Sequence, residues 1–371
     1  MRILFTASGS HIGGATRALM HLMLGLPSIG VKPILLSTPP RKDYLKLYRR
    51  LRERGVELIL SKKRFRGALF WIWLTLSSLK VIKRLGIDLV HCHGTKEAAF
   101  VGLAAKLLKR RVIYTVEGDP LLEISFSPRR YGMLDRVSLK ILWRLGLSLA
   151  DLVVGCSRWM AEHLKRYGVE ASHIHNPIDY ERFSSRSGRG AGRERIIVSV
   201  ARFEKVKGLD TLIKAAQRVV EEFPDTRFIL VGGGSMKEEL QRMASRLGVE
   251  KNVELIDYTP DVDEILAKAS IAVLPSLYEP FGMAAAEAQA SGLPVIATKV
   301  GGLQEIVRDG VDGFLIEPGD WKGLAEKIVK LLRDPGLRER MSREAKASAE
   351  RFAPERIASS YLKIYLRALR R

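Results

Sequence analysis

Apolar residues in the first half of the chain follow two alternating patterns. Short apolar runs predict strands over Arg2–Ser8, Lys32–Ser37, Val56–Ser61, Asp88–Cys92, Arg111–Val116 and Asp151–Cys156. Between them, apolar positions recur at helical spacing and predict helices over Thr16–Leu26, Asp43–Gly55, Trp71–Gly86, Lys96–Lys109, Gly132–Leu149 and Ser157–Gly168. Alternating βα units of this length favour a parallel, doubly wound sheet over an all-α or all-β fold.

Residues 184–194 interrupt this alternation, because Gly, Ser and Arg dominate and no apolar period is present, which is typical of an exposed loop. The alternation restarts at Ile196 and continues to the C-terminus. We therefore expect an α/β chain of two doubly wound, Rossmann-like domains facing across a cleft, at residues 1–176 and 195–352. A linker at 177–194 would join them, and a helix at 353–371 would cross back to the first domain. The cleft would be the natural ligand site.

The composition of the 371 residues excludes several classes of protein. Apolar residues make up 46% and charged residues 28%, so the chain is neither disordered nor collagen-like. Two cysteines, Cys92 and Cys156, have no metal-ligand spacing and are expected to be buried thiols. The longest membrane-like run, Ala68–Leu79, has 12 residues, whereas a membrane span needs about 20. Met1 leads directly into a predicted strand, so we expect a cytoplasmic protein without a signal peptide or transmembrane helix.

The formal net charge of +21 lies mostly in the first half of the chain. Residues 1–180 hold 30 Lys/Arg against 13 Asp/Glu, a charge of +17, and the rest contributes +4. The segment 41–66 alone has eleven basic residues. A one-sided basic surface indicates a polyanionic partner, either nucleic acid or an anionic bilayer, although a merely solvated surface is also possible.

Two loops of the second half have residues suited to a phosphate ligand. Arg202 and Lys207 follow a predicted strand, where two cations together with helix N–H groups suit a diphosphate. An ordinary charged loop has the same appearance. Gly232 and Gly233 lie in a glycine-rich turn that lets the backbone approach a phosphate, or that is a simple turn, since the full G-x-G-x-x-G spacing is absent.

The most specific segment runs from Pro275 to Ala288. Glu279 lies on a strand-to-helix loop, and Glu287 lies in the Ala-rich helix that follows. A helix of small residues can approach a ligand closely, so these two carboxylates are expected to hold hydroxyl groups rather than a metal.

This constellation resembles the retaining glycosyltransferases of family 4, which have the GT-B architecture. The resemblance covers nearly the whole chain. It depends on the carboxylate pair at E-x7-E spacing, on SGLPVIATKVGGLQEIV and DGVDGFLIEPGD after it, and on the match of residues 202–208 to R-x4-K-G. Residues 175–183 resemble the family's interdomain N-G-V-D-x-x-x-F segment, with Pro177 in place of Gly, and residues 88–94 resemble its D-x-x-H-x-H segment. Glu117 stands where many members have the His of T-x-H-G.

The resemblance implies a nucleotide-diphosphate sugar as donor, held by the second domain, and no metal or other cofactor. Arg202 and Lys207 would stabilise the charge of the diphosphate, helped by N–H groups of Gly13 and Gly14. Glu279 would hold the sugar hydroxyls with N–H groups around Phe281, Gly282 and Met283, and Glu287 would hold the ribose. His93 would contact the sugar near the anomeric carbon, and His91 would be structural.

The acceptor side is the less specific part of the interpretation. Glu117 and Asp119 are candidates for an acceptor-side pair, or for a solvated loop. Basic residues beside aromatic ones describe a membrane-facing segment, and we expect it to include Arg49, Arg50, Lys62, Lys63, Trp71 and Trp73. The alternative is a core helix beside a solvated one. A membrane-facing segment favours a lipid-linked or cell-envelope glycan acceptor at the inner face of the membrane.

Two other functions remain open. A GT-B enzyme acting on a soluble sugar, of the sucrose or trehalose synthase type, would not need a basic surface. A nucleic-acid-binding protein is less consistent with the sequence, because no recognition module combining aromatic and basic residues is present and Glu279, Glu287, Arg202 and Lys207 would stay unexplained.

Overall fold

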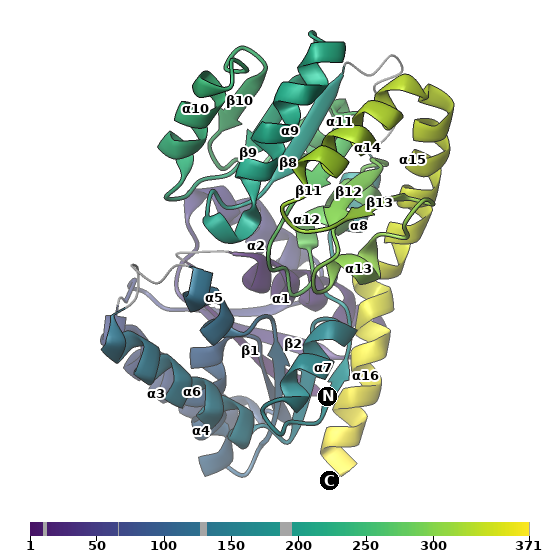
Figure 1. Ribbon diagram of the computed structural model, residues 1–371. Helices are drawn as coiled ribbons and strands as arrows, with labels where there is room; N and C mark the ends of the chain where they lie inside the picture. The colour runs from purple at the N-terminus through teal and green to yellow at the C-terminus, as the bar shows by residue number, and fades with distance from the viewer. Residues whose placement is uncertain (10–12, 66, 127–131, 186–194, 371) are drawn as a thin grey trace. The chain divides into compact units, whose positions relative to one another are not determined.

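The computed structural model describes residues 1–9, 13–65, 67–126, 132–185 and 195–370. Within them the chain divides into two compact units, Met1–Ile178 with Pro354–Arg371, and Asp179–Ala353. Each unit is a parallel sheet with helices on it (Figure 1). Arg66 and most of the predicted 184–194 loop lie outside the described residues.

The first unit has a seven-stranded parallel sheet in the order β3-β2-β1-β4-β5-β6-β7, as far as the described residues show. Its strands are β1 (Arg2–Ala7), β2 (Lys32–Ser37), β3 (Glu57–Leu60), β4 (Leu89–Cys92), β5 (Arg111–Val116), β6 (Leu152–Gly155) and β7 (Ala171–His173). Its helices are α1 (Gly14–Gly25), α2 (Leu45–Glu53), α3 (Gly67–Leu85), α4 (Thr95–Leu107), α5 (Pro120–Phe126), α6 (Met133–Leu149), α7 (Arg158–Lys165) and α16 (Pro354–Arg370). Central strands such as β4 are buried along their whole length, because helices cover both faces of a doubly wound sheet.

The second unit has a six-stranded parallel sheet in the order β10-β9-β8-β11-β12-β13 within the described ranges. Its strands are β8 (Ile196–Val200), β9 (Arg227–Val231), β10 (Val253–Ile256), β11 (Ile271–Leu274), β12 (Val295–Thr298) and β13 (Gly313–Ile316). Its helices are α8 (Tyr180–Ser184), α9 (Leu209–Glu222), α10 (Lys237–Arg246), α11 (Val262–Lys268), α12 (Met283–Ala290), α13 (Leu303–Ile306), α14 (Trp321–Arg333) and α15 (Pro335–Ala349). Both sheets therefore have the doubly wound arrangement that the alternating pattern predicts.

The boundary between the units lies at Ile178 and Asp179, inside the segment predicted as a linker. Part of that segment is structured, since α8 packs against α12 and the Tyr180 hydroxyl donates to the Lys346 carbonyl at 3.4 Å. The sequence pattern did not predict α8, because the helix is short and runs directly into the Gly-, Ser- and Arg-rich residues 184–194.

The C-terminal helix α16, yellow in Figure 1, belongs to the core of the first unit. Its buried side chains share a hydrophobic cluster with α1 and α2 on one face of the sheet. The Tyr365 hydroxyl lies 3.0 Å from His91 Nδ1, and Thr115 Oγ1 lies 2.8 Å from both His91 Nε2 and the Tyr361 hydroxyl. Burial lowers the pKa of His91 well below its ordinary value, so this imidazole is neutral and structural at neutral pH.

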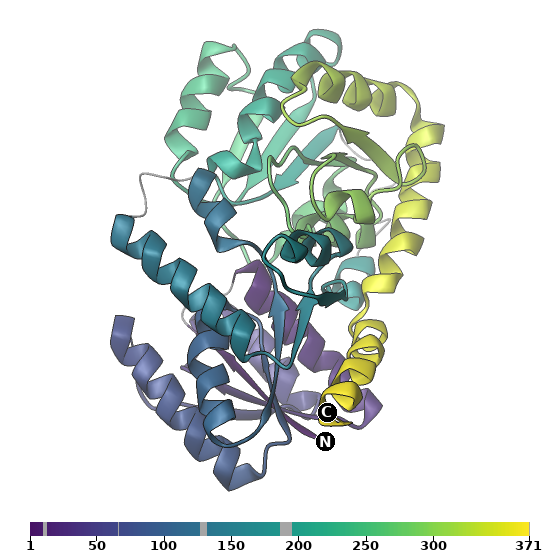
Figure 2. The same cartoon turned by 60° about the horizontal axis from the view of Figure 1, so that its bottom comes forward.

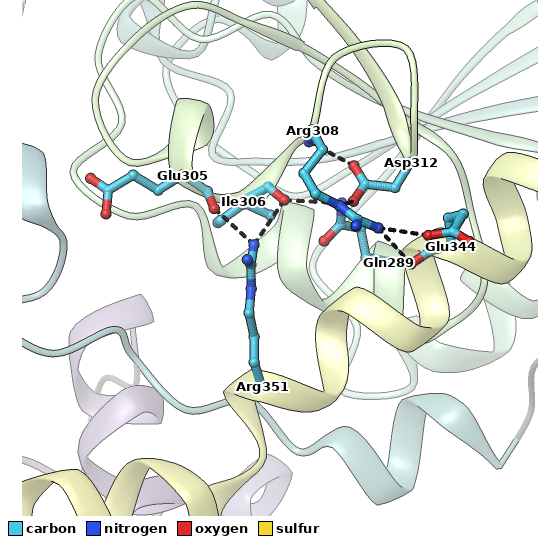
Figure 3. A network of polar contacts seen from close by, with 7 residues as sticks. All are labelled: Gln289, Glu305, Ile306, Arg308, Asp312, Glu344 and Arg351. Carbon is cyan, nitrogen blue, oxygen red and sulfur yellow. Dashed lines mark hydrogen bonds and ion pairs between the residues drawn. The ribbon is translucent and has the colours of Figure 1, made fainter.

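A polar network joins α12, α13 and α15 in the second unit (Figure 3). The buried carboxylate of Asp312 accepts from Arg308 Nε at 2.7 Å and from the Arg308 backbone N–H at 2.8 Å. Arg351 donates to the carbonyls of Glu305 and Ile306, and Gln289 donates to the Ile306 carbonyl as well. These bonds fix the C-terminal end of α13 against the helix that holds Glu287.

Two glycines of α1 give a matched test of how α16 is seated. A Cβ at Gly25 would lie 2.3 Å from the Pro354 carbonyl oxygen, whereas a Cβ at Gly14 would meet no atom within 4 Å. We predict that Gly25→Ala lowers the free energy of unfolding by about 1–3 kcal/mol, and that Gly14→Ala leaves it equal or slightly higher, because alanine favours a helix. Denaturant titration measures both values. Equal stability of the two variants would show that α16 does not rest on α1 in this way.

Candidate active site

The strand order of the second unit reverses between β8 and β11, and the predicted site residues follow these two strands. The chain leaves β8 into the loop with Arg202 and Lys207, and leaves β11 into the loop with Glu279. In doubly wound sheets, ligands bind outside the carboxyl ends of the strands at this reversal of order.

Lys207 and Glu279 form an ion pair across these two loops. Lys207 Nζ lies 2.7 Å from Glu279 Oε2, and the two side chains are 14% and 15% exposed. The Ser276 hydroxyl donates to the same carboxylate oxygen at 3.4 Å. A cation and an anion are thus held together at a surface that solvent still reaches, where an incoming anion can approach Lys207.

Backbone contacts hold the two loops together at glycine positions. Gly208 has φ +59, and a Cβ there would lie 2.1 Å from the Pro275 carbonyl oxygen. The Leu277 N–H donates to the Val206 carbonyl at 2.8 Å and so joins the same two loops. On the loop after β12, the Gly302 N–H donates to the Glu279 carbonyl at 2.9 Å. A side chain at Gly208 would therefore separate Lys207 from Glu279.

Arg202 is exposed on the loop after β8, next to the glycine-rich turn at Gly232 and Gly233. The Phe203 N–H donates to the Gly233 carbonyl at 2.9 Å. A Cβ at Gly232 would lie 1.9 Å from the Ala201 carbonyl oxygen, so packing accounts for that glycine. A Cβ at Gly233 would meet nothing within 4 Å, so packing does not require glycine there.

The helix α12 begins at the end of the Glu279 loop. Gly282 precedes it with φ +110, and Phe281 is buried against Phe352. Met283, the first residue of the helix, is half-buried, and Glu287 one turn further on is 1% exposed. The first N–H groups of a helix point out of its N-terminus, so α12 presents donors beside Glu279 while its Glu287 carboxylate lies inside the unit.

His93, Glu117 and Asn176 form a hydrogen-bonded series in the first unit. His93 Nδ1 lies 2.8 Å from Glu117 Oε1, and Asn176 donates its amide N–H to Glu117 Oε2. His93 is 5% exposed, and its Nε2 has no hydrogen-bond partner among the described residues. The carboxylate fixes the ring and its tautomer, which leaves Nε2 for a ligand.

Asp119 takes a different position from Glu117. It is fully buried and accepts from the Leu121 N–H at 2.8 Å, from the Tyr167 hydroxyl at 2.8 Å and from His163 Nε2 at 2.7 Å. Burial, and then the hydrogen bond between Tyr167 and Asp119, raise the pKa of the Tyr167 hydroxyl to about 12. The two carboxylates predicted as a pair thus bind different partners, and Asp119 is held at the start of α5 with α7 and its following turn.

Gly13 and Gly14 lie where α1 begins, with Gly13 at the N-cap in an extended conformation. Gly14 is exposed, and packing does not require glycine at that position either. The N-terminus of α1 is thus free of bulky side chains at both residues.

The six residues predicted to face a membrane do not form one surface. Arg49 and Arg50 lie on α2, whose buried Tyr48 packs with α1 and α16 on one face of the sheet. Right-handed crossovers place α3 on the other face, because the strand order reverses after β3. Lys62 and Lys63 are exposed before α3.

On α3, Trp71 and Trp73 are half-buried. Trp71 stacks on Phe100 at 5.5 Å between ring centroids, and Trp73 stacks on Phe65 at 5.3 Å. The expectation of a single basic, Trp-bearing surface fails because the sheet separates α2 from α3 and both tryptophans pack against the unit.

Among the described residues, no group of three or more His, Cys, Asp or Glu side chains could hold a metal ion. No helix in that part of the chain is long and apolar enough to cross a membrane.

The two doubly wound units have the architecture of the GT-B fold. Residues 12–182 match the family model described as Glycosyltransferase Family 4, and residues 181–348 match the model described as Glycosyl transferases group 1. The chain therefore belongs to the family 4 glycosyltransferases, as the motifs predicted.

Curated relatives and solved structures agree with this assignment. The chain is 28% identical to N-acetyl-alpha-D-glucosaminyl L-malate synthase of Bacillus anthracis over 78% of its length and 77% of the relative. It is 34% identical to D-inositol 3-phosphate glycosyltransferase of Streptomyces avermitilis over 76% of its length and 66% of the relative. The structure of Anabaena HepE in complex with UDP and glucose superposes with a TM-score of 0.77 at 23% identity, over 98% of this chain and 99% of that one. The last similarity concerns the fold.

Sequence patterns missed two members of the site. Asn176 lies in the segment that resembles the interdomain motif, but its bond to Glu117 joins residues 59 positions apart. Ser276 gave no signal of its own beside Glu279. The Asn176 contact depends on the order of strands in the sheet, which the local pattern does not contain, whereas Ser276 lies three residues before Glu279 in the same loop.

A double-mutant cycle tests the connection of Glu117 to His93. We predict that His93→Ala and Glu117→Gln each lower kcat, by up to about a hundredfold, and that the double variant is no worse than His93→Ala, because Glu117 acts through the imidazole. Glu123→Gln, an exposed acid on α5, is the matched control and should keep full activity. Additive losses would mean that Glu117 acts independently of His93.

Proposed function

We propose that the protein transfers a sugar from a nucleotide-diphosphate sugar to an acceptor, with retention of the anomeric configuration and without a divalent metal. The observation that supports this most is the Lys207–Glu279 pair at the strand reversal of the second unit. The Lys207 ammonium group suits a diphosphate, and the Glu279 carboxylate suits sugar hydroxyls. Retention and metal independence follow from the family resemblance, in which two cations neutralise the diphosphate.

Lys207 and Arg202 would stabilise the negative charge of the diphosphate leaving group. When the bond between the anomeric carbon and the diphosphate oxygen breaks, the bonding electrons go to that oxygen and its negative charge grows. The acceptor oxygen bonds to the anomeric carbon, and its proton leaves on the diphosphate. Donors aimed at such developing charge are typically worth about 3–4 kcal/mol each in the barrier.

The other site residues would bind and orient the donor. Glu279, once diphosphate engages Lys207, would accept from sugar hydroxyls beside the N–H groups of Phe281, Gly282 and Met283. Glu287 would hold the ribose, Gly233 would let the backbone approach the nucleotide, and N–H groups of Gly13 and Gly14 would contact the diphosphate. His93 would use Nε2 on the sugar near the anomeric carbon.

A uridine-diphosphate sugar is the first donor to test, because the similar Anabaena structure holds UDP. For the acceptor we propose a lipid-linked or cell-envelope glycan at the inner face of the membrane, supported by the charge of +17 in residues 1–180. A small soluble acceptor is the second candidate. The names of two relatives favour it, since they specify L-malate and D-inositol 3-phosphate for those enzymes.

The two cations give a direct test of the diphosphate role. We predict that Lys207→Ala and Arg202→Ala each reduce transfer at least about a hundredfold at saturating donor. Lys205→Ala removes an exposed cation from the same turn and should leave turnover unchanged. Near-native turnover of either site variant would contradict the proposed role.

The stereochemistry of the product tests the proposed reaction. We expect NMR of the product to show the same anomeric configuration as the donor, with full activity in EDTA. An inverted product would contradict retention. Loss of activity in EDTA that Mg²⁺ restores would contradict metal independence, and no transfer or hydrolysis with any UDP, GDP or ADP sugar would contradict the function itself.

A further inference from the structure

Exposed apolar side chains of the first unit gather on one layer of helices. α4 packs against both α3 and α6, and the three helices lie side by side in both views (Figures 1 and 2). Most of the large hydrophobic side chains that are exposed in the described residues lie on them: Leu69, Ile72 and Leu76 on α3, Leu103 and Leu107 on α4, and Met133, Leu134, Val137, Ile141 and Leu145 on α6. An exposed apolar surface of this extent marks an interaction site.

The helix α6 shows the arrangement most clearly. Leu134 is 84% exposed, and Val137, Ile141 and Leu145 continue from Met133 at intervals of four residues along one side of the helix. The residue before each of the last three is basic and exposed: Arg136, Lys140 and Arg144. Because residues four apart lie on one face of a helix, an apolar stripe and a basic stripe run next to each other.

This pattern is the reverse of an ordinary surface helix, whose apolar stripe faces the core. The only buried residues of α6 are Trp143, Gly146 and Leu147, in its C-terminal half. The N-terminal half extends its apolar side chains into solvent. An exposed apolar stripe flanked by cations is typical of a helix that lies in the interface of a bilayer.

The α3 helix repeats the arrangement on the far side of α4. Leu69, Ile72 and Leu76 are more than half exposed, and Lys80, Lys83 and Arg84 are exposed further along the same helix. Lys62 and Lys63 are exposed just before it. The half-buried Trp71 and Trp73 are not part of this outer face.

We propose that the outer face of α3, α4 and α6, defined by these ten apolar side chains and the cations beside them, docks on an anionic lipid bilayer. The basic stripe of α6 complements anionic headgroups and would repel the same stripe of a second copy, so charge favours the bilayer over a dimer. Ten exposed apolar side chains distinguish it from a nucleic-acid surface, which is polar and positively charged.

The position of this face agrees with the lipid-side acceptor, and in this respect the inference rests on the proposed function. The helices of a doubly wound unit run antiparallel to its strands. The N-terminal ends of α3 and α6 therefore lie toward the carboxyl ends of β4 and β5, which His93 and Glu117 follow. Docking of these helix ends would bring a bilayer toward the end of the sheet at which His93 lies.

Vesicle co-sedimentation tests the docking face, with vesicles of equal amounts of phosphatidylcholine and phosphatidylglycerol and a pure phosphatidylcholine control. We expect the wild type to bind only the anionic vesicles. Leu134→Asp with Ile141→Asp should lower binding at least about tenfold. Leu366→Asp with Leu369→Asp replaces two exposed leucines of α16 and should bind like the wild type. Arg136→Gln with Lys140→Gln should weaken binding and reduce its dependence on salt.

Three results would overturn the proposal. Wild-type binding by the Leu134/Ile141 variant, with an unchanged melting temperature, would exclude this face. Absence of wild-type binding to anionic vesicles at moderate salt would exclude the bilayer. A wild-type dimer that the Leu134/Ile141 variant converts to a monomer would identify the face as a contact between copies. Hydrolysis of the nucleotide sugar, measured without vesicles, should be the same in all variants. If the wild type hydrolyses no nucleotide sugar, the proposed function is overturned, whereas the vesicle-binding result still tests the docking face.

Discussion

The ion pair between Lys207 and Glu279 is the interaction on which the account of the second unit depends. It joins the loops after the two strands where the sheet order reverses, and Gly208 lets these loops approach each other, because a Cβ there would lie 2.1 Å from the Pro275 carbonyl oxygen. A lysine without a partner at this position would be costly to hold partly buried. Glu279 offsets that cost in the free protein. When a donor binds, its diphosphate can replace Glu279 as the partner of Lys207.

The first unit orients a single imidazole by a similar pairing. Glu117 and Asn176 fix His93, while His91, two residues earlier on the same chain, is locked into the core by Thr115 and Tyr365. Residues two apart on a strand lie on the same side of the sheet, and the His91 and His93 rings are 4.4 Å apart between centroids, so their hydrogen-bond partners distinguish the two imidazoles. His91 thus serves packing, and His93 serves the site. The helix α16 supports this division, because its tyrosines fill the core around His91.

The sequence predicted the fold well because parallel strands buried on both faces read as unbroken apolar runs, and the helices between them keep a clear period. It also predicted the family and the loops that hold Lys207 and Glu279. Short elements such as α5, β7 and α8 gave too little periodicity to be found. The bond of Asn176 to Glu117, the separate environment of Asp119 and the separation of α2 from α3 all depend on contacts distant in sequence. The single surface expected for α2 and α3 was wrong for that reason, since these neighbouring segments of the chain lie on opposite faces of one sheet.

A crystal structure with an intact nucleotide-diphosphate sugar bound without a metal tests the central claim most directly. The account predicts that Lys207 Nζ leaves Glu279 and lies within hydrogen-bonding distance of diphosphate oxygens, with Glu279 accepting from a sugar hydroxyl. A donor bound away from the β8 and β11 loops, with the Lys207–Glu279 pair intact, would contradict it.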